Sequence, residues 1–80
     1  MKTVLLLCGG KSDEHEISLL STKAILDALD PGKYKALLAG ISRDGQWYLC
    51  DPAHYYDGEF RADKIKLNTQ GPLVTLAPYL

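Results

Sequence analysis

The segment Gly9–Ser12 has the composition of a turn that could bind a ligand, because two glycines precede a lysine and a serine. A glycine turn at the start of a helix can hold phosphate with its backbone amides. The phosphate-binding loop pattern, however, requires a glycine where Leu5 stands. The dinucleotide pattern G-x-G-x-x-G requires glycines where Lys11 and Glu14 stand. Nucleotide binding is therefore disfavoured, and the simplest interpretation is that the glycines permit a tight turn from a strand to a helix.

Three acidic residues, Asp13, Glu14 and Glu16, follow this turn at the expected start of a helix. Acids near a helix N-terminus stabilise the helix by about 0.3–1 kcal/mol, so they need no further function. Asp13 and Glu16 also have the spacing of a capping box, with Asp in place of the usual Ser or Thr. If the acids do serve a ligand, they would repel phosphate and attract a cation. If the acids bind a ligand, this turn is therefore a candidate site for the ammonium group of an amino acid.

Helical periodicity places the acids on different sides of the expected helix. At about 100° per residue, Glu14 lies about 60° from Ile17. That position is inside an apolar arc that also contains Leu20, Ser21, Ala24, Ile25 and Ala28. Glu16 lies about 260° from Ile17, in a charged wedge with Lys23. We therefore expect Glu16 to face solvent and Glu14 to point along the core-facing side, where an unpaired carboxylate costs several kcal/mol. Glu14 is the candidate functional acid.

The same helix has a second apolar line on its other side. Leu19 and Leu26, seven residues apart, lie roughly opposite Ile17. A helix that is apolar on two sides is covered on two sides. We expect the sheet to cover the Ile17 side, and another domain or another subunit to cover Leu19 and Leu26.

The hydrophobic pattern predicts an α/β fold that begins with a strand–helix–strand unit, the start of an open parallel sheet. The first apolar run is typical of a strand buried on both faces, and Asp44-Gly45 predicts an antiparallel hairpin at the sheet edge. The expected elements are a strand at Thr3–Cys8, a helix at about Asp13–Asp30, strands at Tyr34–Ser42 and Gln46–Cys50, and possible short strands at Ile65–Leu67 and Leu73–Ala77. One helix covers one face of such a sheet, so the sequence predicts an incomplete domain, a fragment of a larger protein.

Length and charge exclude several classes of function. The 80 residues are 46% hydrophobic and 24% charged, and the net charge is −1, which disfavours nucleic acid and membrane surfaces as partners. The apolar run Val4–Cys8 is shorter than the roughly 7–15 residues of a signal-peptide core, and no run approaches the roughly 20 residues of a membrane span. A cytoplasmic location is expected.

The other chemically capable side chains form no pattern typical of a site. Cys8 and Cys50 lack C-x-x-C spacing, which argues against zinc and favours buried free thiols over a disulfide. His15 and His54 lack metal-ligand spacing, and we expect both at the surface. Four aromatic residues have no interleaved Lys or Arg and are expected to pack rather than stack on bases: Trp47, Tyr48, Tyr55 and Tyr56.

Two segments together resemble one family. Residues 4–19, VLLLCGGKSDEHEISL, closely resemble the N-terminal signature of D-alanine–D-alanine ligases, which is a hydrophobic strand, a Gly-Gly turn and then Ser-x-Glu-His-x-Val/Ile-Ser. Residues 40–49, GISRDGQWYL, resemble the second strand and hairpin of the branch with a longer N-terminal domain. The resemblance is specific up to this hairpin and weak beyond it.

The resemblance implies that residues 1–80 belong to the Rossmann-like, pre-ATP-grasp N-terminal domain of a ligase that makes D-alanyl-D-alanine for peptidoglycan in the cell wall. ATP and magnesium would be held by central and C-terminal ATP-grasp domains outside this sequence, so the chain alone would bind neither and be inactive. Glu14 would contact the ammonium of the first D-alanine as the catalytic-site carboxylate, and Ile17 would surround the methyl group of that substrate. The positions expected to complete or support the site are Ser18, Gly9, Gly10 and Ser12. A homodimer through the first helix would explain Leu19 and Leu26.

Three alternatives remain at this point. A related ligase could join D-alanine to D-lactate, since nothing in this sequence determines the second substrate. The chain could also be a non-catalytic binding or dimerisation module that shares the α/β start. A Rossmann-type nucleotide-binding domain of an unrelated enzyme is disfavoured by the acidic turn and by the incomplete glycine patterns.

Overall fold

The computed structural model describes residues 1–75 and contains a helix and five strands in that range. Their order is β1 (Lys2–Gly9), α1 (His15–Ala28), β2 (Tyr34–Ile41), β3 (Trp47–Cys50), β4 (Tyr56–Asp57) and β5 (Lys66–Leu67). The first five expected elements are confirmed to within two residues at either end. β4 was not expected. The possible strand at residues 73–77 is represented by a single bridge between Leu73 and Tyr48, and its last two residues lie outside the described range.

The main sheet is mixed, with strand order β1-β2-β3. β1 and β2 are parallel, with Leu5 opposite Leu37, and α1 forms the crossover between them. β2 and β3 are antiparallel, with Ile41 opposite Trp47. The predicted edge hairpin is therefore confirmed, and Gly45 in its turn has the positive φ of 87° that favours glycine. The parallel part of this small α/β fold is limited to one pair of strands.

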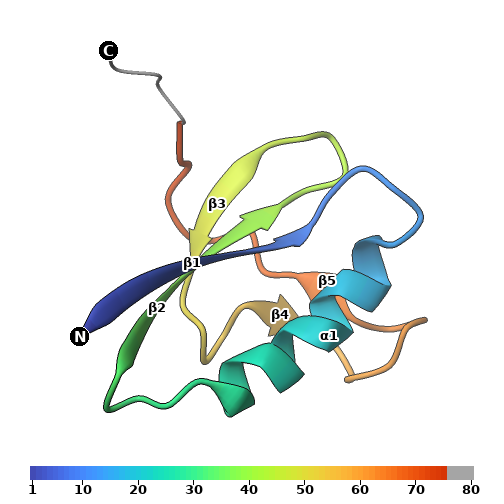
Figure 1. Cartoon of the computed structure of the whole chain (residues 1–80). Coiled ribbons are helices and arrows are strands. Elements are labelled where there is room, and N and C mark those ends of the chain that lie inside the picture. Colours follow the sequence, from blue (N-terminus) through green and yellow to red (C-terminus); the bar gives the residue numbers. More distant parts are fainter. Residues whose placement is uncertain (76–80) are drawn as a thin grey trace.

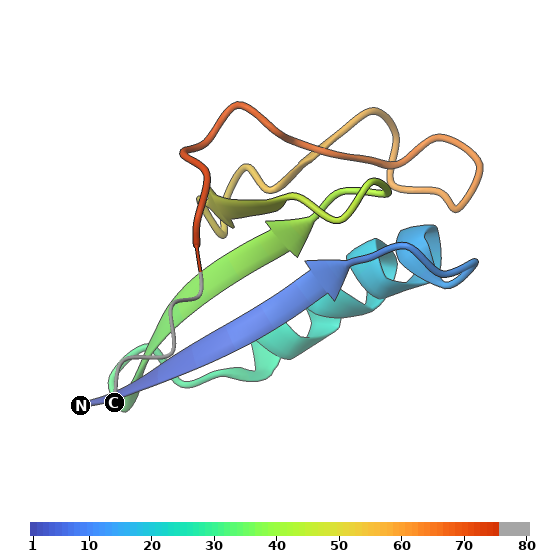
Figure 2. The same cartoon turned by 90° about the horizontal axis from the view of Figure 1, so that it is seen from above.

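One face of the sheet is covered and the other is exposed. Figure 1 shows α1 and the short β4–β5 sheet on the same side of the main sheet, and in Figure 2 α1 lies along β1 whereas the segments after β3 lie at the opposite edge. The buried core on that side consists of Cys8, Leu19, Leu38, Cys50, Tyr55 and Ile65. On the opposite face four large side chains are substantially exposed: Leu5, Leu7, Leu37 and Leu49. The single helix covers one face only, as the sequence predicted, and β1 is not buried on both faces in this chain.

The prediction of which side of α1 faces the core is wrong. The buried residues of the helix are His15, Leu19 and Thr22, whereas Ile17 is 51% exposed and Ile25 is 47% exposed. The core line is hard to recognise because two of its members are polar. Thr22 satisfies its hydroxyl locally, since Oγ1 donates to the Ser18 carbonyl oxygen at 2.8 Å.

This orientation also corrects the expected dimer contact. Leu19 is fully buried within the chain, and the half-buried Leu26 packs against the same core. Leu19 therefore has no surface to offer a second subunit. The exposed apolar surface of α1 is instead the side of Ile17 and Ile25.

Tyr55 connects the segment after β3 to the helix. Its hydroxyl donates a buried hydrogen bond of 2.7 Å to the Leu19 carbonyl oxygen. We predict that Tyr55→Phe lowers the free energy of unfolding by about 1 kcal/mol, because a buried acceptor loses its donor. Urea unfolding followed by circular dichroism measures this, with the exposed Tyr34→Phe as the matched control. Equal effects of the two variants would mean that the Tyr55 hydrogen bond contributes no stability.

The buried thiol of Cys8 makes the fold sensitive to alkali. Burial raises the pKa of Cys8 from 9.0 to about 12, with a smaller contribution from Cys50. Burial likewise raises the pKa of Tyr55 to about 12. At a pH between the ordinary pKa of each group and its raised pKa in the folded chain, the group is deprotonated in the unfolded chain and still protonated in the folded one. The free energy of unfolding therefore falls as the pH rises through this range. We expect a lower urea midpoint at pH 10 than at pH 8, and a smaller difference in Cys8→Ala. A midpoint that does not fall would contradict this.

Candidate functional site

The Gly9-Gly10 turn joins the end of β1 to the start of α1 in a conformation that requires glycine. Gly9 has a φ of 82° and Gly10 a φ of 108°. The amide of Gly9 donates to Ser18 Oγ at 3.0 Å, and the amide of Gly10 donates to the Ile41 carbonyl oxygen at 2.8 Å. The predicted tight turn is confirmed, and it is held from both α1 and β2.

The rest of the turn also uses its own donors. Ser12 Oγ accepts a hydrogen bond from the Glu14 amide at 3.2 Å, and the Ser12 carbonyl oxygen accepts one from the His15 amide at 3.1 Å. With the Gly9 and Gly10 amides also engaged, four backbone donors at this turn form hydrogen bonds within the chain. Within residues 1–75 no three His, Cys, Asp or Glu side chains are grouped to hold a metal ion. The acidic side chains at this turn would also repel the phosphates of ATP, so the turn does not fit that cofactor.

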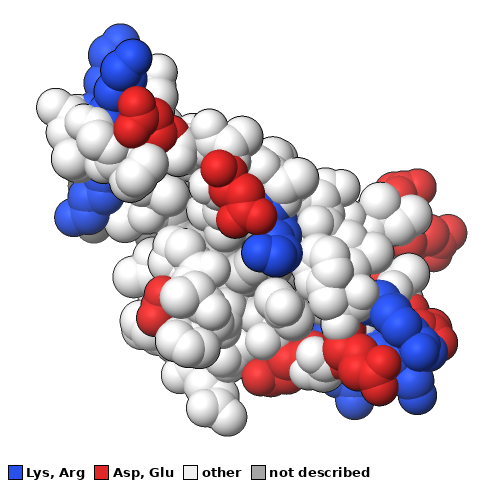
Figure 3. Space-filling view, turned by 90° about the horizontal axis from the view of Figure 1, so that it is seen from below, with Lys and Arg blue, Asp and Glu red and all other residues white. Residues whose placement is uncertain are grey.

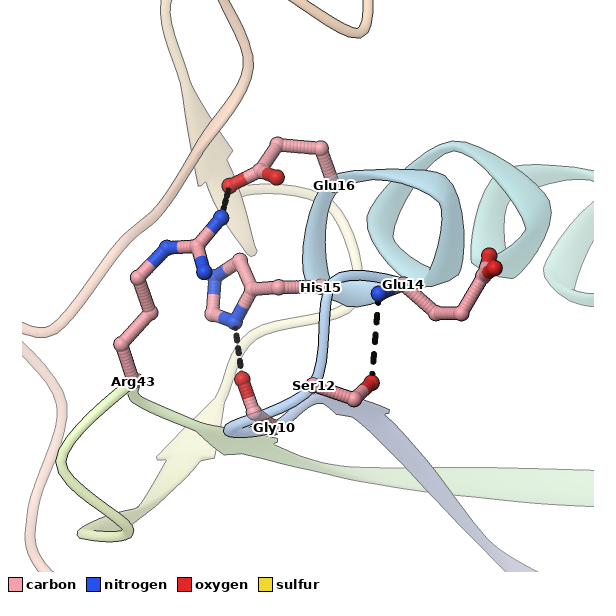
Figure 4. Close-up of polar contacts among 6 residues, drawn as sticks. All are labelled: Gly10, Ser12, Glu14, His15, Glu16 and Arg43. Atoms are coloured by element: carbon pink, nitrogen blue, oxygen red, sulfur yellow. Dashed lines mark hydrogen bonds and ion pairs between the residues drawn. The ribbon is translucent and has the colours of Figure 1, made fainter.

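Glu14 is the residue that begins α1, and its carboxylate is exposed. It has φ −84° and ψ 8° and forms no side-chain capping hydrogen bond. In Figure 4 its side chain points away from the turn and from the opposite side of the helix, where His15, Glu16 and Arg43 lie. The expectation that Glu14 points toward the core is therefore wrong, because the helix presents its other side to the sheet. A carboxylate in this position is free to bind a cation from outside the fold.

Glu16 pairs with Arg43 instead of completing a capping box with Asp13. The pair joins the first turn of α1 to the loop after β2 (Figure 4). The Arg43 hydrogen bond lowers the pKa of Glu16 below its ordinary value. Glu16 therefore helps to hold the helix start against the hairpin, a tether that spacing along the sequence did not reveal.

The other expected site residues lie on either side of Glu14. Ile17 is one turn along the helix and is exposed, so Glu14 and Ile17 share the outer side of α1, as periodicity predicted. Ser18 is directed to the turn, where its hydroxyl binds the Gly9 amide. Ser12 supports the backbone of Glu14. The outer side of α1 thus presents an acidic and an apolar side chain next to each other, and the hydroxyls of Ser12 and Ser18 stabilise the turn that precedes the helix.

His15 is a residue whose position the sequence interpretation missed. It is 5% exposed, and its Nδ1 lies 2.7 Å from the Gly10 carbonyl oxygen. His54 is exposed, as expected, with Nδ1 3.2 Å from Asp51 Oδ2. The spacing of His15 from Leu19, Thr22 and Leu26 follows the helical period, and this signal could have identified His15 as part of the buried line.

The charge pattern around α1 agrees with the small net charge. Figure 3 shows the face that lies below the sheet in Figure 1, where acidic and basic side chains lie next to each other in clusters separated by uncharged surface. No helix among residues 1–75 has the length and apolarity needed to cross a membrane.

Comparison with known proteins identifies relatives over nearly the whole chain. Residues 3–74 match the family described as the D-ala D-ala ligase N-terminus. The D-alanine–D-alanine ligase of Oceanobacillus iheyensis is 42% identical over 77 residues, which is 96% of this chain and 21% of that protein. D-alanine–D-alanine ligase A of Escherichia coli K12 is 49% identical over 47 residues, 59% of this chain and 13% of that protein.

Solved structures of ligases are also similar to this chain. The D-alanine-D-alanine ligase from Coxiella burnetii superimposes with a TM-score of 0.63 at 44% identity, over 66% of this chain and 16% of that one. The VanG D-Ala:D-Ser ligase from Enterococcus faecalis gives a TM-score of 0.58 at 34% identity, over 74% of this chain and 16% of that one. The chain thus spans about a fifth or less of the length of these relatives. With its turn, its helix and nearly all its residues matched, the chain belongs to the family of D-alanine–D-alanine ligase N-terminal regions.

Proposed function

We propose that this chain is the N-terminal, substrate-binding part of an ATP-dependent ligase that joins two D-alanines into D-alanyl-D-alanine. The family match over residues 3–74 supports this proposal, as do the curated relatives, which are named D-alanine–D-alanine ligases. In such a ligase the product would enter peptidoglycan synthesis in the cytoplasm. The names of the relatives favour D-alanine over D-lactate as the second substrate, and the family match favours a ligase over a non-catalytic module.

Glu14 is proposed to bind the ammonium group of the first D-alanine. The observation that carries this role is the exposed carboxylate at the start of α1, which makes no capping hydrogen bond. A charge-assisted hydrogen bond from an ammonium to a carboxylate is short and strong, so it would orient the substrate. Ile17, exposed on the same side of α1, would contact the methyl group. Ser18 was expected to contact the substrate too, but its hydroxyl accepts a hydrogen bond from the Gly9 amide, so we propose that it supports the turn behind these two residues. Gly9, Gly10 and Ser12 hold the backbone that carries Glu14.

The remaining parts of the reaction are proposed to lie outside these residues. Central and C-terminal ATP-grasp domains would hold ATP and magnesium and would form the acyl phosphate, and residues 1–80 would be the Rossmann-like domain before them. The chain by itself is then expected to be inactive. A homodimer remains a prediction, without the Leu19 contact on which it was based.

The proposed function is tested by ADP release from the ligase that carries this sequence, in the presence of magnesium and ATP. We expect turnover that depends on D-alanine and is absent with L-alanine, with D-alanyl-D-alanine as the product. Turnover that is indifferent to D-alanine would contradict the proposal. Product with D-lactate in place of the second D-alanine would instead support the related ligase.

A further inference from the structure

The side chain of His15 joins the start of α1 to the Gly9-Gly10 turn (Figure 4). Its Nδ1 lies 2.7 Å from the Gly10 carbonyl oxygen. Since a carbonyl oxygen only accepts hydrogen bonds, Nδ1 carries the hydrogen in this contact. The ring also packs against the turn itself, because a Cβ added at Gly9 would lie 3.2 Å from His15 Cε1.

This contact matters because the turn consists of two glycines with positive φ. Glycine has the widest conformational freedom of any residue, so the turn depends on outside contacts to keep one shape. Ser18 supplies one contact through the Gly9 amide, at 3.0 Å. His15 supplies another through the Gly10 carbonyl, from the position directly after Glu14. The place of Glu14 relative to β1 is therefore coupled to the His15 ring.

We propose that His15 is a positioning residue, which holds Glu14 in place for the substrate ammonium through the Gly10 carbonyl and does not touch the substrate. This inference rests on the proposed function of Glu14. The two side chains point in opposite directions in Figure 4, so His15 acts through the backbone. An apolar side chain could fill the same buried space, but it would leave the Gly10 carbonyl oxygen without this donor. Displacing a substrate-binding group by a fraction of an ångström weakens its contact with the substrate.

Two amide variants of the ligase separate hydrogen bonding from packing. The side-chain nitrogen of Asn can occupy the position of Nδ1, whereas that of Gln occupies the position of Nε2. We expect His15→Gln to raise the KM for the first D-alanine about tenfold, equivalent to about 1.4 kcal/mol, with the KM for ATP nearly unchanged. His15→Asn, which retains the donor, should stay within about threefold of the unaltered enzyme.

The outcome that overturns the inference is an equal effect of the two variants on the KM for D-alanine, or no effect of His15→Gln. Thermal unfolding of both variants is measured alongside, to show whether each of them folds. If His15→Gln does not fold, the KM of His15→Asn for D-alanine is decisive. A KM close to that of the unaltered enzyme supports the inference, and a tenfold rise contradicts it. Glu14→Gln in the same assay distinguishes the two proposals. If Glu14→Gln leaves the KM for D-alanine unchanged, the proposed function fails and this inference fails with it. If Glu14→Gln raises that KM and His15→Gln does not, the His15 inference alone fails.

A double variant adds an independent check. Two residues that act on the same contact show non-additive effects, whereas independent residues show additive ones. His15→Gln should therefore raise the KM for D-alanine little further when Glu14 has already been replaced by Gln. If His15→Gln raised the KM for D-alanine a further tenfold in the Glu14→Gln variant, His15 would act independently of Glu14.

Discussion

Replacing Glu14 with Gln in the ligase is expected to raise the KM for the first D-alanine by about tenfold to a hundredfold. The change keeps the shape of the side chain and removes its negative charge. The substrate ammonium then loses a charge-assisted hydrogen bond, which is worth more than a neutral one. The KM for ATP should stay nearly constant, because ATP is proposed to bind to domains outside these residues and the acidic turn would repel its phosphates. Initial rates with each substrate varied in turn provide the measurement.

The matched control is Asp13→Asn, which removes an exposed charge from the neighbouring position. Long-range attraction of the ammonium would be weakened similarly in both variants, whereas a direct contact would be lost only in Glu14→Gln. We expect Asp13→Asn to change the KM for D-alanine by less than about twofold. Equal effects of the two substitutions would reduce Glu14 to one of several acids at a helix start.

Replacing Gly9 with Ala is expected to destabilise the fold by at least about 2 kcal/mol. The residue has a φ of 82°, which residues with a Cβ rarely adopt. A Cβ at this position would also overlap the backbone carbonyl of Ile41, which cannot move without breaking the pairing of β1 with β2. Urea unfolding of the chain measures the loss, and we expect the variant to unfold at a clearly lower midpoint.

Gly10→Ala separates the two causes of this loss. Gly10 also has a positive φ, of 108°, but a Cβ there would meet no atom within 4 Å. Its cost should therefore be the backbone strain alone, about 1–2 kcal/mol. If Gly10→Ala destabilised the chain as much as Gly9→Ala, close packing of the turn against Ile41 would not be the reason that Gly9 is required.

The elements of the fold were predictable because each has a local signal. The continuous apolar run gave β1, the Asp30-Pro31-Gly32 segment ended the helix, and Asp44-Gly45 formed the hairpin. Each of these signals is contained in a few consecutive residues, so it can be recognised without knowledge of the tertiary structure. β4 has only two residues, Tyr56–Asp57, and its pairing with β5 depends on contacts across a loop, which no local pattern encodes.

The orientation of α1 was not predictable from hydrophobicity, since both of its sides are partly apolar. The exposed side carries Ile17 and Ile25, and the buried side mixes Leu19 with His15 and Thr22. The polar members of the buried side are tolerated because each finds a backbone acceptor nearby, at Gly10 or at Ser18. Such pairing appears only once the turn and the helix are in place. The sequence therefore identified Glu14 and Ile17 as neighbours but assigned their side of the helix to the core.

A crystal structure of the ligase that carries this N-terminal sequence, with D-alanine bound, tests the role of Glu14 most directly. We predict that a carboxylate oxygen of Glu14 lies about 2.7–2.9 Å from the ammonium nitrogen of the first D-alanine. Ile17 should lie against the methyl group of the same molecule. An ammonium held by a different carboxylate, with Glu14 facing solvent, would contradict this role.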